Sequence, residues 1–258
     1  MALMRTNLGT LALILASLAP AFVVAAPALA RDALPAGFVY LRELAPGIAQ
    51  DMRYATADNF TGHPLPGYDA NECVLRRDVA LALAKVQADL ARENYSLKVY
   101  DCYRPTRAVA AFVRWAKDGA RTSPTKRFFP ALEKRMLFAQ GYIAAQSAHS
   151  TGTAIDLTII QLPAAAPAPY DPAARYGACT GPASARAPDN SLDMGTGFDC
   201  FDAKSHTSSP AITNDQKFSR AVLNNSMKLH GFKNYFREWW HFTYGSARGM
   251  PLYDFPIR

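Results

Sequence analysis

Two short stretches constrain the fold most strongly, because their side chains suit a single metal centre. In the first stretch His149 precedes Asp156 by seven residues, and a glycine lies between them. In the second stretch Glu238 precedes His241 by three residues, with two tryptophans between. Two histidines and one aspartate supply three protein ligands and leave a fourth position for water, as a catalytic zinc site requires. Glu238 then remains free to act as a base.

The neighbouring residues predict how the chain brings these groups together. Residues 154–160 have the β-branched alternation of a strand, which would hold Asp156 rigidly. Gly152 permits a tight turn that folds His149 back beside Asp156. Residues 238–244 read as an aromatic strand that closes the core. Each spacing is a weak pattern alone, but their joint presence favours a metal site.

The other histidines offer alternatives for the metal centre. His63 and His206 are competing ligands, and His206 has Asp202 and Ser205 as neighbours, which is also consistent with support of a loop. His230 ends a predicted helix, where the helix dipole favours a cation, so its position favours a structural role.

Residues 1–30 read as a signal peptide. Arg5 precedes an apolar run over residues 8–26, and Ala-Leu-Ala at 28–30 is a small-x-small cleavage site. The alternative is a membrane anchor, but the run contains Gly, Thr, Ser and Pro and ends in a good processing site. No later stretch is apolar enough to span a bilayer. We therefore expect an exported, periplasmic protein with no stable membrane insertion after cleavage.

The mature chain, residues 31–258, has a length that fits one domain. Half of all residues are hydrophobic, which is enough for a packed core. Removal of Arg5 lowers the net charge from +7 to +6. The basic doublets at 76–77 and 126–127 are short and are not interleaved with aromatics, so we expect no nucleic-acid partner.

Four cysteines remain after export, in a compartment where disulfides persist. They allow three pairings, of which we favour Cys73 with Cys102 and Cys179 with Cys200. The second pair encloses a loop that reads as poorly structured, and closing such a loop restricts the unfolded chain. None of the four has CxxC spacing, so none is assigned to the metal.

Hydrophobic periodicity predicts two amphipathic helices and one partial helix. The first spans residues 77–93, the second spans 215–230 and ends at Gly231, and part of 132–145 is expected to be helical. On one face of the second helix we expect Phe218, Val222, Leu223 and Met227.

Two strand predictions precede Arg104, the second of them closely. Residues 38–52 predict one or two short strands, and 97–101 predict a buried strand. Pro105 ends that strand and opens a helix over 108–115. Arg104 therefore lies at a strand-to-helix junction, where an arginine is usually a surface or ion-pair residue. The functional alternative is a guanidinium that stabilises an oxyanion.

Two segments read as loops. Residues 53–62 are dense in Asn, Asp and Gly, and by itself Tyr54 favours packing over binding. Residues 163–190 are rich in Ala, Pro and Gly with little periodicity, which is typical of a surface insertion too short and polar for a separate domain.

These motifs together resemble the VanX-type zinc D-alanyl-D-alanine dipeptidases, which belong to the LAS metallopeptidase group in peptidase family M15. The SxHxxGxAxD and EWWH elements are highly specific together, and the Tyr-Arg-Pro and EWWHF contexts favour the dipeptidase branch. The matching stretches follow the family's order over nearly all of the mature chain: residues 54–56, 59–62, 101–105, 147–150, 156–158, 194–195, 198–199, 205–206 and 238–242.

The resemblance implies a role for each matching residue. The ligands of one Zn²⁺ ion per chain would be His149, Asp156 and His241. Glu238 would move a proton from the attacking water to the leaving amine, and Arg104 would stabilise the oxyanion. The residues that hold the ends of the dipeptide would be Ser147, Tyr54 and Asp199, with Asp199 suited to the ammonium group.

We therefore predict a single α+β domain of the LAS type, with a central antiparallel sheet flanked by helices. The expected function is zinc-dependent hydrolysis of the small dipeptide D-alanyl-D-alanine to two D-alanines, in peptidoglycan turnover or recycling. One alternative is a peptidoglycan DD-carboxypeptidase or endopeptidase of the same group. Another is a non-catalytic, metal-stabilised wall-binding protein, against which Glu238 argues because a structural site needs no base. The insertion at 163–190 and the signs of export depart from the family's pattern.

Overall fold

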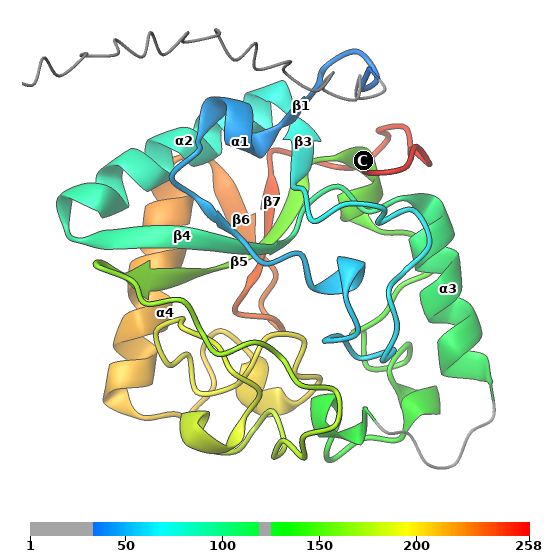
Figure 1. The fold of residues 1–258 in the computed structure, drawn as a ribbon, viewed down its shortest axis with the longest axis vertical. Helices are drawn as coiled ribbons and strands as arrows, with labels where there is room; N and C mark the ends of the chain where they lie inside the picture. The colour runs from blue at the N-terminus through cyan, green and yellow to red at the C-terminus, as the bar shows by residue number, and fades with distance from the viewer. Residues whose placement is uncertain (1–32, 119–124) are drawn as a thin grey trace, which may run out of the picture. The chain divides into compact units, whose positions relative to one another are not determined.

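The computed structural model describes residues 33–118 and 125–258 (Figure 1). The predicted signal peptide, residues 1–30, lies outside the described residues. No helix in the described ranges combines the length and apolar character needed to cross a membrane.

A five-stranded sheet forms the centre of the fold and confirms the α+β class. Three neighbouring strand pairs are antiparallel, and one edge pair is parallel. The strand order is β2-β4-β5-β7-β6. The strands are β2 (Ala49–Gln50), β4 (Tyr95–Asp101), β5 (Ala154–Gln161), β7 (His241–Tyr244) and β6 (Phe232–Asn234).

Helices cover the sheet, and their bounds lie close to the predicted ones. Helix α2 (Arg77–Arg92) packs against β4, and α4 (Asn214–Leu229) packs against β6 and α2. Helix α3 (Thr106–Lys117) begins directly after Pro105, as predicted, and lies apart from the other two (Figure 1). A short helix and a second, two-stranded antiparallel sheet complete the N-terminal part: α1 (Leu41–Leu44), β1 (Phe38–Tyr40) and β3 (Val74–Arg76).

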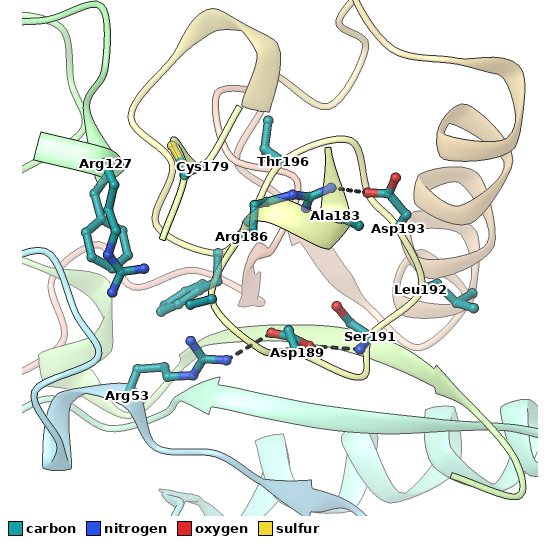
Figure 2. A pocket seen from close by; sticks show the side chains of 15 residues that line it. Arg53, Arg127, Cys179, Ala183, Arg186, Asp189, Ser191, Leu192, Asp193 and Thr196 are labelled. Atoms are coloured by element: carbon teal, nitrogen blue, oxygen red, sulfur yellow. Dashed lines mark hydrogen bonds and ion pairs between the residues drawn. The ribbon is translucent and has the colours of Figure 1, made fainter. Parts of the chain in front are cut away.

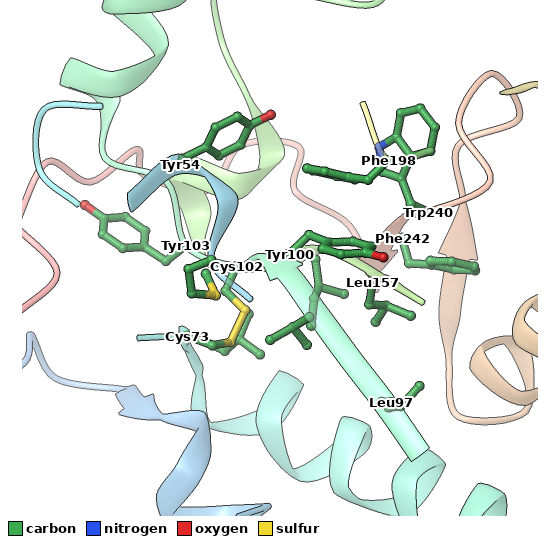
Figure 3. Packing of buried hydrophobic residues seen from close by; sticks show 14 of the residues in the cluster. Tyr54, Cys73, Leu97, Tyr100, Cys102, Tyr103, Leu157, Phe198, Trp240 and Phe242 are labelled. Atoms are coloured by element: carbon green, nitrogen blue, oxygen red, sulfur yellow. A yellow bond between two sulfur atoms is a disulfide. The ribbon is translucent and has the colours of Figure 1, made fainter. Parts of the chain in front are cut away.

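The core is continuous on both faces of the central strands. Residues 154–160 of β5 are all buried, and so is β4 after its first residue. Helices and loops cover both faces of these strands, which is why their side chains are buried on both faces. The aromatic rings of Tyr100 and Phe198 stack with centroids 4.5 Å apart, and Trp240 meets Phe198 edge-on (Figure 3). This packing joins β4 to loops from the C-terminal half of the chain.

The buried face of α4 differs from the predicted one. Phe218 is 62% exposed, whereas Leu223 and Met227 are buried as expected. The guanidinium of Arg220 is buried instead and donates hydrogen bonds to the carbonyl oxygens of Met194, Lys204 and His206. Because each helical residue advances about 100°, residues 219, 220, 223 and 227 form the inner face, and Phe218 lies outside it.

Two further predictions of local structure are confirmed only in part. Residues 132–145 hold only one short 3₁₀ turn, Lys134–Met136, and otherwise form turns. The predicted strand over 238–244 begins only at His241, because the side-chain amide of Asn234 donates to the carbonyl oxygens of Glu238 and His241 and closes a turn there.

Both disulfides join the pairs that the sequence favoured, Cys73 with Cys102 and Cys179 with Cys200. Two disulfides are typical of an oxidising compartment. The segment 163–190 is mostly exposed and contains only the 3₁₀ turn Ala183–Ala185. Its end is anchored rather than free, because the carboxylate of Asp189 meets the side chains of Lys98 and Tyr100 at 2.6 and 2.7 Å.

The turn at Gly152 yields a stability prediction. Gly152 has φ +77°, and an added Cβ would lie 2.4 Å from Cε1 of Phe38. We expect Gly152→Ala to lower the free energy of unfolding by at least about 1–2 kcal/mol from backbone strain alone, with the steric clash adding to it. Urea unfolding measures this change. Gly47→Ala is the matched control, because its added Cβ meets nothing within 4 Å. Equal stability of the two variants would contradict the tight turn.

Candidate active site

Three ligand atoms converge at one point of the structure. Nε2 of His149 lies 3.1 Å from Nδ1 of His241 and 3.3 Å from Oδ1 of Asp156. The Nδ1 of His241 and the Oδ1 of Asp156 are 3.0 Å apart. An ion about 2.0–2.1 Å from each of its tetrahedral ligands would space them about 3.3 Å apart. The three predicted ligands therefore fit a small divalent cation.

The sheet register and one turn produce this convergence. Asp156 on β5 pairs with His241 on β7 on one side and with Asp101 on β4 on the other. His149 comes from the 3₁₀ turn Ala148–Thr151, which ends at Gly152 in the left-handed conformation, as the sequence predicted. The turn folds the His149 ring over the middle strand.

Asp101, for which no role was predicted, orients both His149 and Arg104. Nδ1 of His149 lies 2.7 Å from the carbonyl oxygen of Cys102 and 3.1 Å from Oδ2 of Asp101. A hydrogen on Nδ1 leaves the lone pair of Nε2 for a metal. Asp101 also accepts from Nε of Arg104 at 2.9 Å and from the hydroxyl of Tyr68 at 2.5 Å. Its place at the end of a buried strand was the available signal.

Arg104 lies at the strand-to-helix junction that the sequence predicted. Its guanidinium carbon is 5.0 Å from the ring centroid of Tyr54 and 5.0 Å from that of Phe112. One nitrogen also lies 3.6 Å from Oδ2 of Asp156. Aromatic rings and carboxylates thus hold a fixed positive charge beside the ligand cluster.

Asp199 is a buried acid with one side-chain hydrogen bond among the described residues. It is 3% exposed, and its Oδ2 accepts from the hydroxyl of Tyr54 at 2.7 Å. Burial raises the pKa of Asp199 well above its ordinary value, and repulsion from Asp156 adds to the increase. Such a carboxylate gains stability from an incoming cation. Tyr54 also packs edge-on against Phe112, so it serves packing as well.

Ser147 lines the same cavity but has a structural contact. Its Oγ accepts a hydrogen bond from the backbone N–H of His149 at 3.2 Å and caps the turn that carries this ligand. The hydroxyl therefore helps to position His149, in addition to facing the cavity.

Glu238 lies in the turn before β7 and also lines the cavity. Its Oε2 is 3.9 Å from Nδ1 of His241, and the residue is 8% exposed. Burial raises the pKa of Glu238 well above its ordinary value, and the carboxylates of Asp156 and Asp199 add to the increase. A carboxyl group with a raised pKa is suited to accept and return a proton near neutral pH.

The alternative histidines lie outside the ligand cluster. In the described ranges, a single group of three or more His, Cys, Asp or Glu side chains is close enough to share an ion, and it consists of the three predicted ligands. Nε2 of His206 lies 3.3 Å from the hydroxyl of Tyr142, and Nε2 of His230 lies 2.6 Å from Oδ2 of Asp89.

The cavity around these groups has a volume of about 240 Å³. It gathers the three ligands with Arg104 and Glu238, and the remaining wall includes Phe60, Tyr142 and Trp240.

A second, smaller cavity, shown in Figure 2, has a structural character. The guanidinium of Arg53 pairs with Asp189, and that of Arg186 pairs with Asp193. Arg127, which also lines it, pairs with Asp58. Opposite charges thus balance the three arginines within the protein.

The fold and the site together define a metallopeptidase. The chain belongs to the peptidase M15 family, because the family profile described as D-ala-D-ala dipeptidase matches residues 35–168 and 185–257. The profile leaves out residues 169–184, which lie within the predicted insertion.

Curated relatives resemble this chain over most of its length. A D-alanyl-D-alanine dipeptidase of Enterococcus faecalis is 36% identical over 206 residues, covering 80% of this chain and 90% of the relative. A protein of the same name from Enterococcus faecium is 32% identical, covering 86% and 98%. Another from Streptomyces coelicolor is 34% identical, covering 85% and 98%.

The contacts of Asp101 predict a defect in metal binding. In Asp101→Asn the charge that faces His149 and Arg104 is lost, and we expect the affinity for Zn²⁺ to fall about 10–100-fold. Titration of the purified protein against a zinc indicator measures this affinity. Tyr68→Phe is the control, because it removes one donor to Asp101 and keeps the carboxylate. An unchanged affinity in Asp101→Asn would show that Asp101 does not orient His149.

Proposed function

We propose that this chain hydrolyses D-alanyl-D-alanine to two D-alanines and that one Zn²⁺ ion is held by His149, Asp156 and His241. The observation that carries the proposal is the convergence of these three ligand atoms within 3.3 Å of one another. Family membership and the names of the curated relatives support the substrate. A zinc ion there supplies Lewis-acid chemistry, polarising a carbonyl group and lowering the pKa of water.

Glu238 and Arg104 are the proposed catalytic residues. Glu238 accepts a proton from the attacking water and delivers it to the nitrogen of the leaving D-alanine, so its carboxyl returns to the starting state. Arg104 faces the negative charge that develops on the carbonyl oxygen. Because Asp101 and two aromatic rings hold the guanidinium, little reorganisation is needed during the reaction.

We propose that the substrate's ammonium group meets Asp199 and Tyr54 and that Ser147, which lines the same cavity, helps to hold the dipeptide. This arrangement favours the dipeptidase over the carboxypeptidase alternative. A stem peptide carries an amide where the dipeptide carries its ammonium group. An amide would leave the buried carboxylate of Asp199 without a cation, which is costly.

We also propose that the protein is exported and acts in peptidoglycan turnover. The leader pattern in residues 1–30 and the two disulfides support this location. An exported enzyme would meet dipeptide released outside the cytoplasm. Recovery of the active protein from the cytoplasmic fraction would contradict the location.

Glu238→Gln tests the proposed mechanism. The substitution keeps the shape of the side chain and removes its ability to take a proton. We expect kcat for D-alanyl-D-alanine to fall by about 10²–10⁴-fold, with zinc content near one ion per chain. Release of D-alanine measures kcat, and Glu93→Gln on the exposed surface is the control. Full activity in Glu238→Gln would exclude Glu238 as the base.

The same assay separates the two enzymatic alternatives. With wild-type protein we expect cleavage of the free dipeptide and none of an N-acylated tripeptide that ends in the same pair. Cleavage of the acylated peptide would instead favour the carboxypeptidase. If zinc binds and neither substrate is cleaved, the wall-binding alternative is favoured.

A further inference from the structure

The insertion, residues 163–190, supplies one residue, Cys179, that is bonded to the chain beside the proposed substrate site. Cys179 lies in residues 169–184, the part of the chain that the family profile leaves out. Its disulfide partner, Cys200, follows Asp199 directly in the sequence. The insertion is therefore bonded covalently to the neighbour of the acid that is proposed to receive the substrate's ammonium group.

Cys179 holds the Asp199 turn on both sides. Its carbonyl oxygen accepts a hydrogen bond from the backbone N–H of Gly197 at 2.9 Å, and its sulfur is bonded to Cys200. Its own N–H donates to the carbonyl oxygen of Arg127 at 2.8 Å. In Figure 2, Cys179 lies between Arg127 and Thr196. Residues 198 and 199 are thus enclosed between two attachments to one buried residue.

Asp199 has a conformation that needs such support. Its φ is +55°, in the left-handed region that only a few per cent of residues other than glycine adopt, mostly Asn and Asp. Its carboxylate is buried close enough to Asp156 for repulsion to act on it. A left-handed backbone and a buried carboxyl group persist where the surrounding structure determines both. The hydroxyl of Tyr54 contributes one contact, and Cys179 contributes the backbone attachments.

We propose that the Cys179–Cys200 disulfide is a positioning device for Asp199, so that the affinity for the substrate's ammonium group depends on this covalent link. The proposal rests on the proposed function, in which Asp199 meets that ammonium group. Cys179 and Cys200 act through Asp199 and do not touch the substrate themselves. The insertion thereby supports the part of the cavity wall that Asp199 forms.

The pair variant Cys179→Ala with Cys200→Ala tests this inference. We expect KM for D-alanyl-D-alanine to rise about tenfold or more, the scale of a lost hydrogen bond to a charged group. We expect kcat at saturating substrate and zinc content to change far less, because the ligands and Glu238 have other supports. Lys204→Met is the matched control, because it removes a different contact to the insertion, the bond from Nζ to the carbonyl oxygen of Thr180.

A double-mutant cycle with Asp199→Asn separates positioning from general destabilisation. Asparagine tolerates the left-handed conformation, so this substitution mainly removes the charge. If the disulfide acts through Asp199, removing the disulfide from the Asp199→Asn variant should raise KM by less than about twofold. A full, additive rise in that background would overturn the proposal, as would an unchanged KM in the pair variant.

The cycle also distinguishes failure of the inference from failure of the proposed function. If Asp199→Asn raises KM and the pair variant does not, the positioning role alone is wrong. If Asp199→Asn leaves KM unchanged, or the wild-type protein does not cleave the dipeptide, the underlying function is wrong.

Reduction offers a second route if the pair variant does not fold. A phosphine reductant converts the disulfide of the folded wild-type enzyme into two thiols, and the phosphine becomes its oxide with oxygen and protons supplied by water. Alkylation and mass spectrometry identify molecules in which only Cys179 and Cys200 are reduced. In a preparation that consists of such molecules, we expect the same rise in KM for D-alanyl-D-alanine. An unchanged KM would overturn the proposal.

Discussion

The register of three neighbouring strands is the constraint on which the site depends. It places Asp101, Asp156 and His241 in one row across β4, β5 and β7. A shift of any strand by one residue would turn its side chain to the opposite face of the sheet. The same strand pairing therefore fixes two proposed ligands, Asp156 and His241, together with Asp101, which orients the third ligand. Burial of β4 and β5 on both faces stabilises that pattern.

Charge balance is the second organising feature. Four carboxyl groups, those of Asp101, Asp156, Asp199 and Glu238, are buried in one region, and the guanidinium of Arg104 lies among them. Buried acids repel one another, and this repulsion contributes to the raised pKa values of Asp199 and Glu238. A divalent cation at the ligand cluster and an ammonium group at Asp199 would each supply missing positive charge. The electrostatics of the cavity thus agree with a metallopeptidase that takes a substrate with a free amino terminus.

Much of this arrangement could be predicted from the sequence, because the decisive groups lie in short motifs. His149, Gly152 and Asp156 belong to one turn and strand, and the glycine with the β-branched run that follows it predicted that His149 folds back beside Asp156. Arg104 was placed at its junction by Pro105, which cannot continue a strand.

Features that depend on tertiary contacts could not be predicted in this way. Asp101 has no special spacing, and its role appears only when β4 pairs with β5. The exposure of Phe218 follows from the burial of Arg220 against distant carbonyl groups. Likewise, the turn at Glu238 depends on the side chain of Asn234.

The location of a bound metal ion tests directly whether His149, Asp156 and His241 form the metal site. Crystals grown with Zn²⁺ and measured at the zinc absorption edge would give an anomalous difference map. We expect one peak per chain, about 2.0–2.2 Å from Nε2 of His149, Nδ1 of His241 and a carboxylate oxygen of Asp156. A peak at His63 or His206, or no peak at these three residues at saturating zinc, would show that they are not the metal ligands.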